Sequence, residues 1–283
     1  MKRISFLNGN FINHAEAYIH IEDRGMQFAD GVYEVILFYK SQLIDNEWHL
    51  ERLFRSLNEM DIKLPYTYEE LSNIMMDLCQ QNNLENASVY IQVTRGVTNR
   101  NQLIPEGINP TLIMTVSPLT ITTTDELING YSAVTLEDIR WQRCDIKSIS
   151  LIASSLSKQK AVDLGYSEAI FVRNNTVTEC SFSNLFMVDN NDNLVTKNLD
   201  NHVLAGITRK RVIKLAKAAG ITVIEKPFTP DELIAAKEVF ATSTTLLIRP
   251  LTKINETIIG TGKCGSITTK LIENYQQFLN NID

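Results

Sequence analysis

Strand and helix signals alternate along the whole chain, and one polar segment interrupts them. Apolar residues at four positions from Leu50 to Leu57 follow the i, i+3, i+4, i+7 spacing of an amphipathic helix, and Val32–Tyr39 has the β-branched and aromatic character of a buried strand. The dipeptide Asn8-Gly9 predicts a hairpin turn. In the first half of the chain, the patterns predict strands over residues 4–7, 10–13, 32–39, 88–94 and 111–117 and helices over residues 48–60 and 68–81.

The interruption is Pro118–Thr124, a threonine-rich segment that begins with a proline and lacks a helical stripe. We take residues 119–124 as the linker between a smaller N-terminal α/β domain, residues 1–118, and a larger C-terminal domain, residues 125–283. Beyond the linker, the patterns predict strands over residues 133–136, 168–172, 184–188, 222–225 and 239–241 and helices over residues 150–164, 208–219, 230–236 and 266–279. The expected fold class is therefore mixed α and β (α+β), in two domains.

Composition excludes several classes of function. The 283 residues include 27 Lys and Arg against 33 Asp and Glu, so the chain lacks the basic excess that nucleic-acid binding requires. The first ten residues lack the apolar run of a secretion signal, and no stretch approaches the ~18 apolar residues of a membrane span, so we expect a cytoplasmic protein. The four cysteines and four histidines are scattered, without metal-ligand spacing or a Ser-His-Asp grouping, so we expect reduced thiols and no metal site.

Two segments could bind a phosphate. Gly206-Ile207-Thr208 precedes a predicted helix with Thr208 as its N-cap, and the free backbone N–H groups at a helix start favour an anion. Thr242-Ser243-Thr244-Thr245 offers four hydroxyl groups directly after an apolar strand. Taken alone, each segment favours a plain structural role, since helix starts and hydroxyl-rich turns are common.

Three charged residues lie in sequence contexts that would allow a catalytic or binding role. Lys147 stands between a strand-like region and a helix, and a lysine amine is nucleophilic only when it is unprotonated, which burial or a nearby cation favours. Glu179 stands among hydroxyl groups at the entry of an apolar strand, where it could accept a proton from a ring N–H or be exposed. Arg52 lies off the apolar stripe of its helix, where it could supply positive charge or simply be solvated.

Together and in this order, these segments resemble the fold-type IV pyridoxal-phosphate enzymes over nearly the whole chain. That family contains D-amino acid aminotransferases, branched-chain aminotransferases and aminodeoxychorismate lyases, and the resemblance is closest to the D-amino acid aminotransferases. The segments that carry the resemblance are Glu22–Val35, Val93–Gly96, Asp138–Trp141, Cys144–Ser148, Arg173–Glu179 and Thr242–Thr245.

The resemblance implies pyridoxal 5'-phosphate as cofactor, bound between the two lobes. Lys147 is implied to hold the cofactor covalently and to move the proton between the substrate Cα and the cofactor C4′ atom. Glu179 is implied to face the pyridine nitrogen and keep it protonated, which lets the ring withdraw electrons. Leu204 would pack against the ring, and the phosphate would be held by Arg52, Ile207, Thr208, Ser243 and Thr244.

The resemblance also implies a site for the substrate carboxylate. Tyr33 and Arg100 match positions that bind this group, and Arg100 is implied to reach across from the partner subunit of a homodimer; an arginine fork pairs a carboxylate with two hydrogen bonds. The sequence departs from the family nearby, because Gln102 stands where the family has histidine and Phe182 stands where small residues usually follow the glutamate. A further departure is Leu246–Arg249, which is more apolar than usual. We therefore count Gln102 and Phe182 among the candidate substrate-binding residues.

We expect transamination of small-molecule substrates, from a D-amino acid, typically D-alanine, to a 2-oxo acid such as 2-oxoglutarate. The altered carboxylate site leaves two alternatives open: an aminodeoxychorismate lyase, which gives 4-aminobenzoate and pyruvate, and an L-branched-chain amino acid aminotransferase. A non-enzymatic binding role is disfavoured because Lys147 and Glu179 are both present. The preference for D or L donors depends on which side of the ring holds the carboxylate, so it stays open here.

Overall fold

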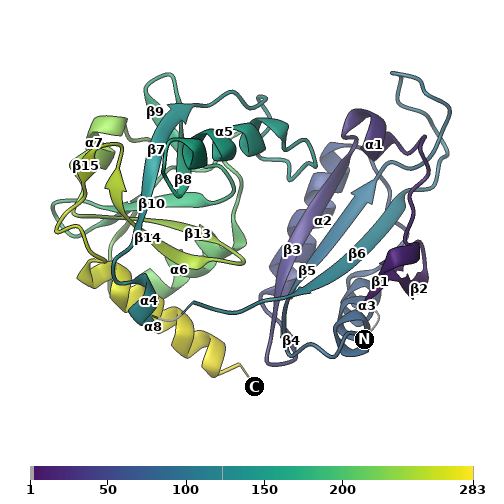
Figure 1. Cartoon of the computed structure of the whole chain (residues 1–283), viewed down its shortest axis with the longest axis horizontal. Coiled ribbons are helices and arrows are strands. Elements are labelled where there is room, and N and C mark those ends of the chain that lie inside the picture. The colour runs from purple at the N-terminus through teal and green to yellow at the C-terminus, as the bar shows by residue number, and fades with distance from the viewer. Residues whose placement is uncertain (1–2, 123, 283) are drawn as a thin grey trace. The chain divides into compact units, whose positions relative to one another are not determined.

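The computed structural model describes residues 3–122 and 124–282 (Figure 1). Within them the chain forms two compact units: the first runs to Thr120 and also contains Ile146–Ser150, and the second comprises Ile121–Asp145 and the chain from Leu151 onward. The division falls in the segment predicted as a linker; its residue Thr123 lies outside the described residues, and helix α4 (Thr124–Leu127) begins at its last residue. The assignment of two independent domains stays a prediction.

The described part of the first unit is built on an antiparallel sheet with the strand order β2-β1-β6-β5-β3-β4. The hairpin predicted at Asn8-Gly9 is confirmed, since Leu7 pairs with Asn10 and the two turn residues have φ angles of 46° and 91°. The strands are β1 (Ile4–Leu7), β2 (Asn10–Asn13), β3 (Gly31–Tyr39), β4 (Gln42–Leu43), β5 (Asn86–Thr94) and β6 (Thr111–Pro118).

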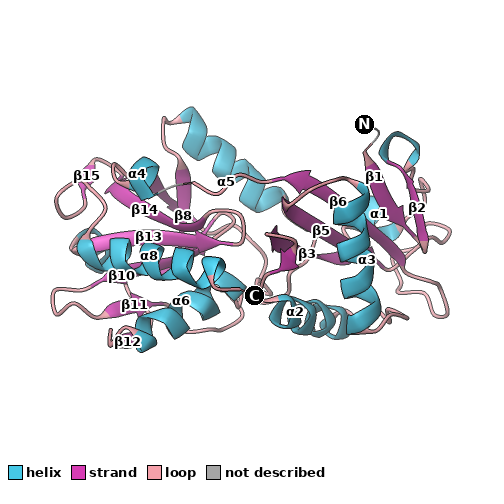
Figure 2. Ribbon diagram, turned by 90° about the horizontal axis from the view of Figure 1, so that it is seen from below, coloured by secondary structure: helices cyan, strands magenta, loops and turns pink. Residues whose placement is uncertain are grey.

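Helices α2 (Asn46–Glu59) and α3 (Tyr68–Gln81) pack against this sheet (Figure 2). Both were predicted from their apolar stripes, which are buried in one core with the inward residues of β3 and β5. Thr67 and Glu70 form a capping box that fixes the start of α3. The short helices η1 (His14–Glu16) and α1 (Arg24–Phe28) were not predicted, because neither is long enough to show a stripe.

The second unit contains a mixed sheet of nine strands among the described residues, in the order β12-β11-β10-β13-β14-β7-β8-β9, with β15 paired to β14. Strand pairs β11 with β12, β14 with β7, and β7 with β8 are parallel, and the remaining pairs are antiparallel. The strands are β7 (Tyr131–Glu137), β8 (Glu168–Arg173), β9 (Thr176–Cys180), β10 (Asn184–Val188), β11 (Leu194–Thr196), β12 (Val223–Glu225), β13 (Glu238–Ser243), β14 (Leu247–Ile254) and β15 (Thr257–Ile258).

Four further helices pack in the second unit. Helices α6 (Ile207–Ala218) and α8 (Ser266–Asn280) contact β13, and α5 (Ile152–Asp163) contacts β7 and β8. Helix α7 (Pro230–Ile234) begins with a capping box between Thr229 and Glu232. All four were predicted within a few residues of these bounds.

Several strands of the second unit were missed by the sequence patterns. Strand β9 pairs with β8 across Asn174 and Asn175, whose φ angles of 48° and 57° mark a two-residue hairpin turn, and this asparagine pair is the signal that could have predicted it. Glu179 was expected at the entry of the following strand, but it lies inside β9. Strand β14 escaped prediction because Arg249, Pro250 and Lys253 obscure the alternation of its apolar residues. The short strands β4, β11 and β15 were also not predicted.

Candidate active site

The segment that carries Lys147 lies along the start of β3 in the first unit. The carbonyl of Lys147 accepts from the N–H of Tyr33 at 3.0 Å, and the N–H of Ile149 donates to the carbonyl of Gly31 at 3.1 Å. These backbone bonds on either side of Ser148 fix the position of Lys147, whose Nζ lies 4.2 Å from the centroid of the Tyr33 ring. The structure therefore brings together two predicted site residues that are 114 positions apart in the sequence.

Arg52 is buried in the first unit, contrary to the solvated alternative. Its Nε and Nη2 donate to the two carboxylate oxygens of Glu34, at 2.7 and 2.9 Å, in a bidentate pair. The Nδ1 atom of His49, one helical turn before Arg52, lies 2.8 Å from the same carboxylate. Glu34 points from β3 into helix α2 and is fully buried. Glu34 and His49 were not predicted as site residues; the available signal was one glutamate inside an otherwise apolar strand.

The charges of this cluster are set by burial and by each other. Burial raises the pKa of the Glu34 carboxyl, but the charge of Arg52 and the hydrogen bonds from His49 and Arg52 outweigh it and hold that pKa well below its usual range. Burial, together with the charges of Arg52 and Lys147, lowers the pKa of His49 and outweighs the Glu34 carboxylate, which raises it. The cluster therefore contains an ionised Glu34, a charged Arg52 and a neutral His49 at pH 7.

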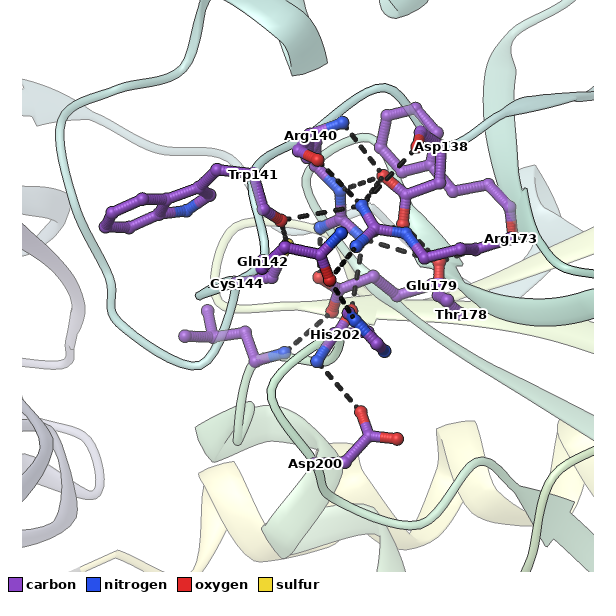
Figure 3. A network of polar contacts seen from close by, with 12 residues as sticks. Asp138, Arg140, Trp141, Gln142, Cys144, Arg173, Thr178, Glu179, Asp200 and His202 are labelled. Carbon is purple, nitrogen blue, oxygen red and sulfur yellow. Dashed lines mark hydrogen bonds and ion pairs between the residues drawn. The ribbon is translucent and has the colours of Figure 1, made fainter.

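Glu179 occupies the centre of a polar network in the second unit (Figure 3). Arg140 Nη1 donates to one carboxylate oxygen, and the Nδ2 of Asn184 at 2.9 Å and the N–H of Leu204 at 3.2 Å donate to the other. Arg140 is held in turn by Asp138 through two hydrogen bonds of 2.9 Å. Glu179 is 5% exposed, so the second unit holds it as a buried, fully hydrogen-bonded carboxyl group.

Two opposing effects act on Glu179. Burial raises its pKa above the ordinary value, although the Arg140 charge and the donors from Arg140 and Leu204 act to lower it. Arg140 stays protonated: burial opposes its charge, but Asp138 and Glu179 outweigh burial and raise the pKa of Arg140. A buried carboxyl with a raised pKa, next to a fixed cation, is suited to sharing a proton with a basic nitrogen.

The start of helix α6 and the end of β13 meet at Asn184. Asn184 pairs with Thr242 of β13, and its Oδ1 would lie 1.9 Å from a Cβ placed on Gly206. Gly206 is the N-cap of α6 and makes no side-chain cap, so Thr208 lies inside the first turn and its prediction as the N-cap was wrong. A side chain at Gly206 would therefore clash with Asn184, and the helix begins directly after this glycine, at Ile207.

This corner of the second unit suits an anion. The N–H groups in the first turn of α6, at Ile207 and Thr208, have no partner within the helix, and they carry the positive end of its dipole. The Thr242 hydroxyl is buried and finds no hydrogen-bond partner within the described residues. Ser243 and Thr244 follow at the end of β13, both half-buried. Asn184 thus links Glu179 and the Leu204 carbonyl, to which it donates, with Thr242 of β13 and with Gly206 at the start of α6.

Of the candidate substrate-binding residues, Arg100, Gln102 and Phe182 are exposed and Tyr33 is half-buried. Arg100 and Gln102 belong to the loop between β5 and β6 in the first unit, and the Arg100 guanidinium lies 4.6 Å from the centroid of the Phe28 ring. Phe182 is 46% exposed in the turn between β9 and β10 of the second unit. Tyr33 packs beside Tyr90, with ring centroids 5.8 Å apart. The roles assigned to these residues remain proposals, as do those of Arg52 and Lys147.

The residues that hold Glu179 in place were not predicted either. Arg140 and Asp138 lie in a segment that carries the family resemblance but had no predicted role, and Asn184 was predicted only as the first residue of a strand. Their contacts join β9 to segments up to 40 positions away, so local spacing carries no signal for them.

Metal binding, thiol chemistry and membrane spanning were also considered for the described residues. Their His, Cys, Asp and Glu side chains form no group that could hold a metal ion. Burial raises the pKa of the Cys79 thiol to about 12 and that of Cys144 to about 11, so neither is suited to act as a nucleophile. In the part of the chain that the structure describes, no helix has the length and apolar character needed to span a membrane.

Comparison with known proteins identifies the family. A D-alanine aminotransferase of Listeria monocytogenes serotype 1/2a (strain 10403S) is 40% identical over 278 residues, which cover 98% of this chain and 95% of the relative, and one of Staphylococcus haemolyticus is 39% identical over 97% of both chains. The branched-chain amino acid aminotransferase of Escherichia coli has the same fold, with a TM-score of 0.93, 24% identity and coverage of 99% of this chain and 95% of the other. The model of the class IV amino-transferase family matches residues 31–254, and the chain belongs to this family.

Proposed function

We propose that the protein is a pyridoxal-phosphate-dependent transaminase that moves the amino group of a D-amino acid, D-alanine, to a 2-oxo acid such as 2-oxoglutarate. The observation that carries this proposal is the 40% identity with a D-alanine aminotransferase over 98% of the chain. The resemblance of Glu22–Val35 and Cys144–Ser148 to the D-amino acid aminotransferases supports the same activity. The likeness to branched-chain enzymes supports the fold alone.

The residues of the second unit fit pyridoxal 5'-phosphate. The unpartnered Thr242 hydroxyl and the free N–H groups at the start of α6 offer donors to a phosphate, and a Cβ at Gly206 would collide with Asn184 beside them. When bound, the cofactor supplies a protonated ring that withdraws electrons and so makes the substrate Cα–H acidic. In the proposed site Ile207, Thr208, Ser243, Thr244 and Arg52 hold the phosphate, and Leu204 packs against the ring.

Two residues carry the proton transfers in the proposed reaction. Lys147 would hold the cofactor covalently through its Nζ, and once the substrate amine has replaced it there, the freed Lys147 amine would move the proton between the substrate Cα and the cofactor C4′. Glu179 keeps the proton on the pyridine nitrogen. Arg140, Asn184 and the N–H of Leu204 fix its carboxyl group, so that no solvent reorganisation is needed during the reaction.

In this proposal the substrate carboxylate is bound by the guanidinium group of one candidate residue and the phenol hydroxyl of another. We assign Arg100 and Tyr33 to this group, with Gln102 and Phe182 lining the space for the side chain. In this proposal Arg100 acts from the partner subunit of a homodimer. We also propose that the enzyme is located in the cytoplasm. Size-exclusion chromatography with light scattering tests the dimer, and cell fractionation tests the location.

A donor panel on the purified holoenzyme tests the function. With D-alanine and 2-oxoglutarate we expect pyruvate, and with L-alanine or L-leucine under the same conditions we expect turnover at least about a hundredfold lower. Activity with L-leucine but not with D-alanine would identify an L-branched-chain aminotransferase instead. Release of 4-aminobenzoate from aminodeoxychorismate without an amino acceptor would identify the lyase. A visible absorbance band that is absent from Lys147→Ala ties the cofactor to that residue.

A further inference from the structure

Arg24 joins three parts of the first unit through one buried guanidinium group. It lies in α1, is 4% exposed, and its Nε donates to Asp30 at 2.7 Å. Its Nη1 donates to the backbone carbonyls of Asn101 at 2.6 Å and Leu103 at 3.3 Å. Two carbonyls of one loop therefore converge on a single cation that is closed off from solvent, where such hydrogen bonds are strong.

The loop held by Arg24 is the one that carries Arg100. The Leu103 N–H donates to the Asn101 side chain at 3.0 Å, which closes a tight turn around the Arg24 contact. The Phe28 ring contacts both arginines, with centroid distances of 4.7 Å to Arg24 and 4.6 Å to Arg100. Arg100 itself is exposed, and no carboxylate within residues 3–122 and 124–282 pairs with it, so its fork is available for a ligand.

A second arginine shares the same anchor but holds different backbone. Arg95 donates to Asp30 at 2.8 Å, and its other nitrogens donate to the carbonyls of Met60 at 2.6 Å and Asp61 at 3.0 Å. Burial raises the pKa of Asp30, but the hydrogen bonds and charges of Arg95 and Arg24 outweigh it and lower that pKa, so Asp30 is ionised and binds both. Arg95 is thus matched to Arg24 in burial and partners, without touching the loop.

We propose that Arg24 is a positioning residue for substrate binding: its guanidinium holds the Arg100–Leu103 loop, and thereby sets the place of the Arg100 fork that receives the substrate carboxylate. This proposal rests on the proposed function, because it takes Arg100 as the carboxylate ligand. A lysine has one compact donor group and cannot reach Asp30 and both loop carbonyls together, so Arg24→Lys keeps the charge and releases the loop.

The first experiment compares Arg24→Lys with its matched control Arg95→Lys in the holoenzyme. We expect Arg24→Lys to raise the KM for D-alanine and 2-oxoglutarate about tenfold, with kcat changed less than about twofold, because a misplaced Arg100 weakens binding before the chemistry. Arg95→Lys lowers the melting temperature by a similar amount and leaves both KM values unchanged. Equal KM effects in the two variants, or none in Arg24→Lys, would overturn the proposal.

The second experiment follows the loop itself and needs no activity. Trypsin cleaves after arginine, so cleavage at the exposed Arg100–Asn101 bond, mapped by mass spectrometry, reports the mobility of the loop. We expect cleavage at least about fivefold faster in Arg24→Lys than in wild type, and an unchanged rate in Arg95→Lys. Asn101 is exposed, and Asn101→Ala removes the side chain that closes the turn without changing the buried Arg24. We expect both faster cleavage and a raised KM for this variant.

The outcomes separate this proposal from the proposed function. If wild-type enzyme fails to turn over D-alanine, the proposed function fails, while the trypsin rates still decide whether Arg24 holds the loop. If cleavage after Arg100 is equally slow in Arg24→Lys, Asn101→Ala and wild type, Arg24 does not hold the loop. Faster cleavage with unchanged KM would refute the link between the loop and the substrate carboxylate.

Discussion

Glu179 and Glu238 both accept three hydrogen bonds, yet only Glu179 lies in the proposed site. Glu179 receives its donors from Arg140, Asn184 and Leu204, whereas Glu238 receives the N–H groups of Ile267 and Thr268 and the Thr268 hydroxyl, at 2.7 to 3.1 Å. The Glu238 bonds fix the start of α8. Comparing variants of Glu179 and Glu238 therefore distinguishes a catalytic role of a carboxylate from a structural one.

Glu179→Gln tests the role of the negative charge. Glutamine keeps the shape but loses the anion beside the ring nitrogen, so we expect kcat for D-alanine to fall at least about a hundredfold while the cofactor stays bound. Glu238→Gln should lower the melting temperature and leave kcat near the wild-type value. Steady-state rates and the absorbance spectrum of both variants provide the measurement, and unchanged turnover in Glu179→Gln contradicts the assignment.

His49 contributes a pH dependence to stability. Its pKa is lowered by burial, so below about pH 6.5 the unfolded chain takes up a proton that the folded chain does not, and the free energy of unfolding falls as the pH falls. Asn is expected to keep a donor near Glu34 without titrating. Between about pH 7.5 and pH 5.5 we expect the melting temperature to fall less steeply in His49→Asn than in wild type. Identical slopes in His49→Asn and in wild type would count against the neutral burial of His49.

At the scale of elements, the start of helix α6 depends on one close approach. A Cβ at Gly206 would lie 1.9 Å from the Asn184 Oδ1, and Asn184 also donates to Glu179, so a side chain there disturbs the helix start and the carboxylate together. The start of α8 offers a matched case, because Gly265 is its N-cap and a Cβ would lie 2.1 Å from the Glu238 carboxyl carbon. These two glycines allow a test of the phosphate-binding role of α6.

Gly206→Ala should weaken cofactor binding, whereas Gly265→Ala should not. We expect the Kd of apoprotein for pyridoxal 5'-phosphate, titrated by absorbance, to rise about tenfold or more in Gly206→Ala, because the first-turn N–H groups of α6 shift with the displaced asparagine. Both substitutions should lower the melting temperature. A Kd that rises equally in the two variants would show a general loss of stability rather than a local effect at α6.

The same elements show what sequence patterns can predict. Helix α3 was predicted with its observed bounds, because its stripe and its capping box are local. The burial of Arg52 was not, since its partner Glu34 comes from a strand 18 positions away and the helical stripe alone places Arg52 outside the core. The N-cap of α6 was misplaced because Thr208 has a side chain typical of a cap, whereas the helix begins at Ile207 after Gly206, a glycine that lies against Asn184 from another strand.

At the scale of the whole molecule, an anionic protein has to bind anionic substrates. The formal net charge is -6, while the proposed ligands carry carboxylates and a phosphate. Interactions between exposed charges are screened beyond a Debye length of about 8 Å, so fixed local cations and helix-start N–H groups outweigh the net charge at contact distance. Arg100 is exposed and has no carboxylate partner among the described residues, so we propose that its charge serves an anionic ligand.

Mixing two impaired variants tests whether Arg100 serves the site of the partner subunit. Lys147→Ala removes the base, and Arg100→Ala should raise the KM for 2-oxoglutarate about thirtyfold or more while the Kd for the cofactor changes little. In a homodimer with Arg100 acting across the interface, a hybrid of the two variants contains one site with both wild-type residues. Random reassociation makes about half of the dimers hybrid, each with one of two sites intact, so activity at low substrate should recover to about a quarter of wild type. If Arg100 acts within its own subunit, no hybrid site is complete and mixing restores nothing; reassociation is verified independently with differently tagged subunits.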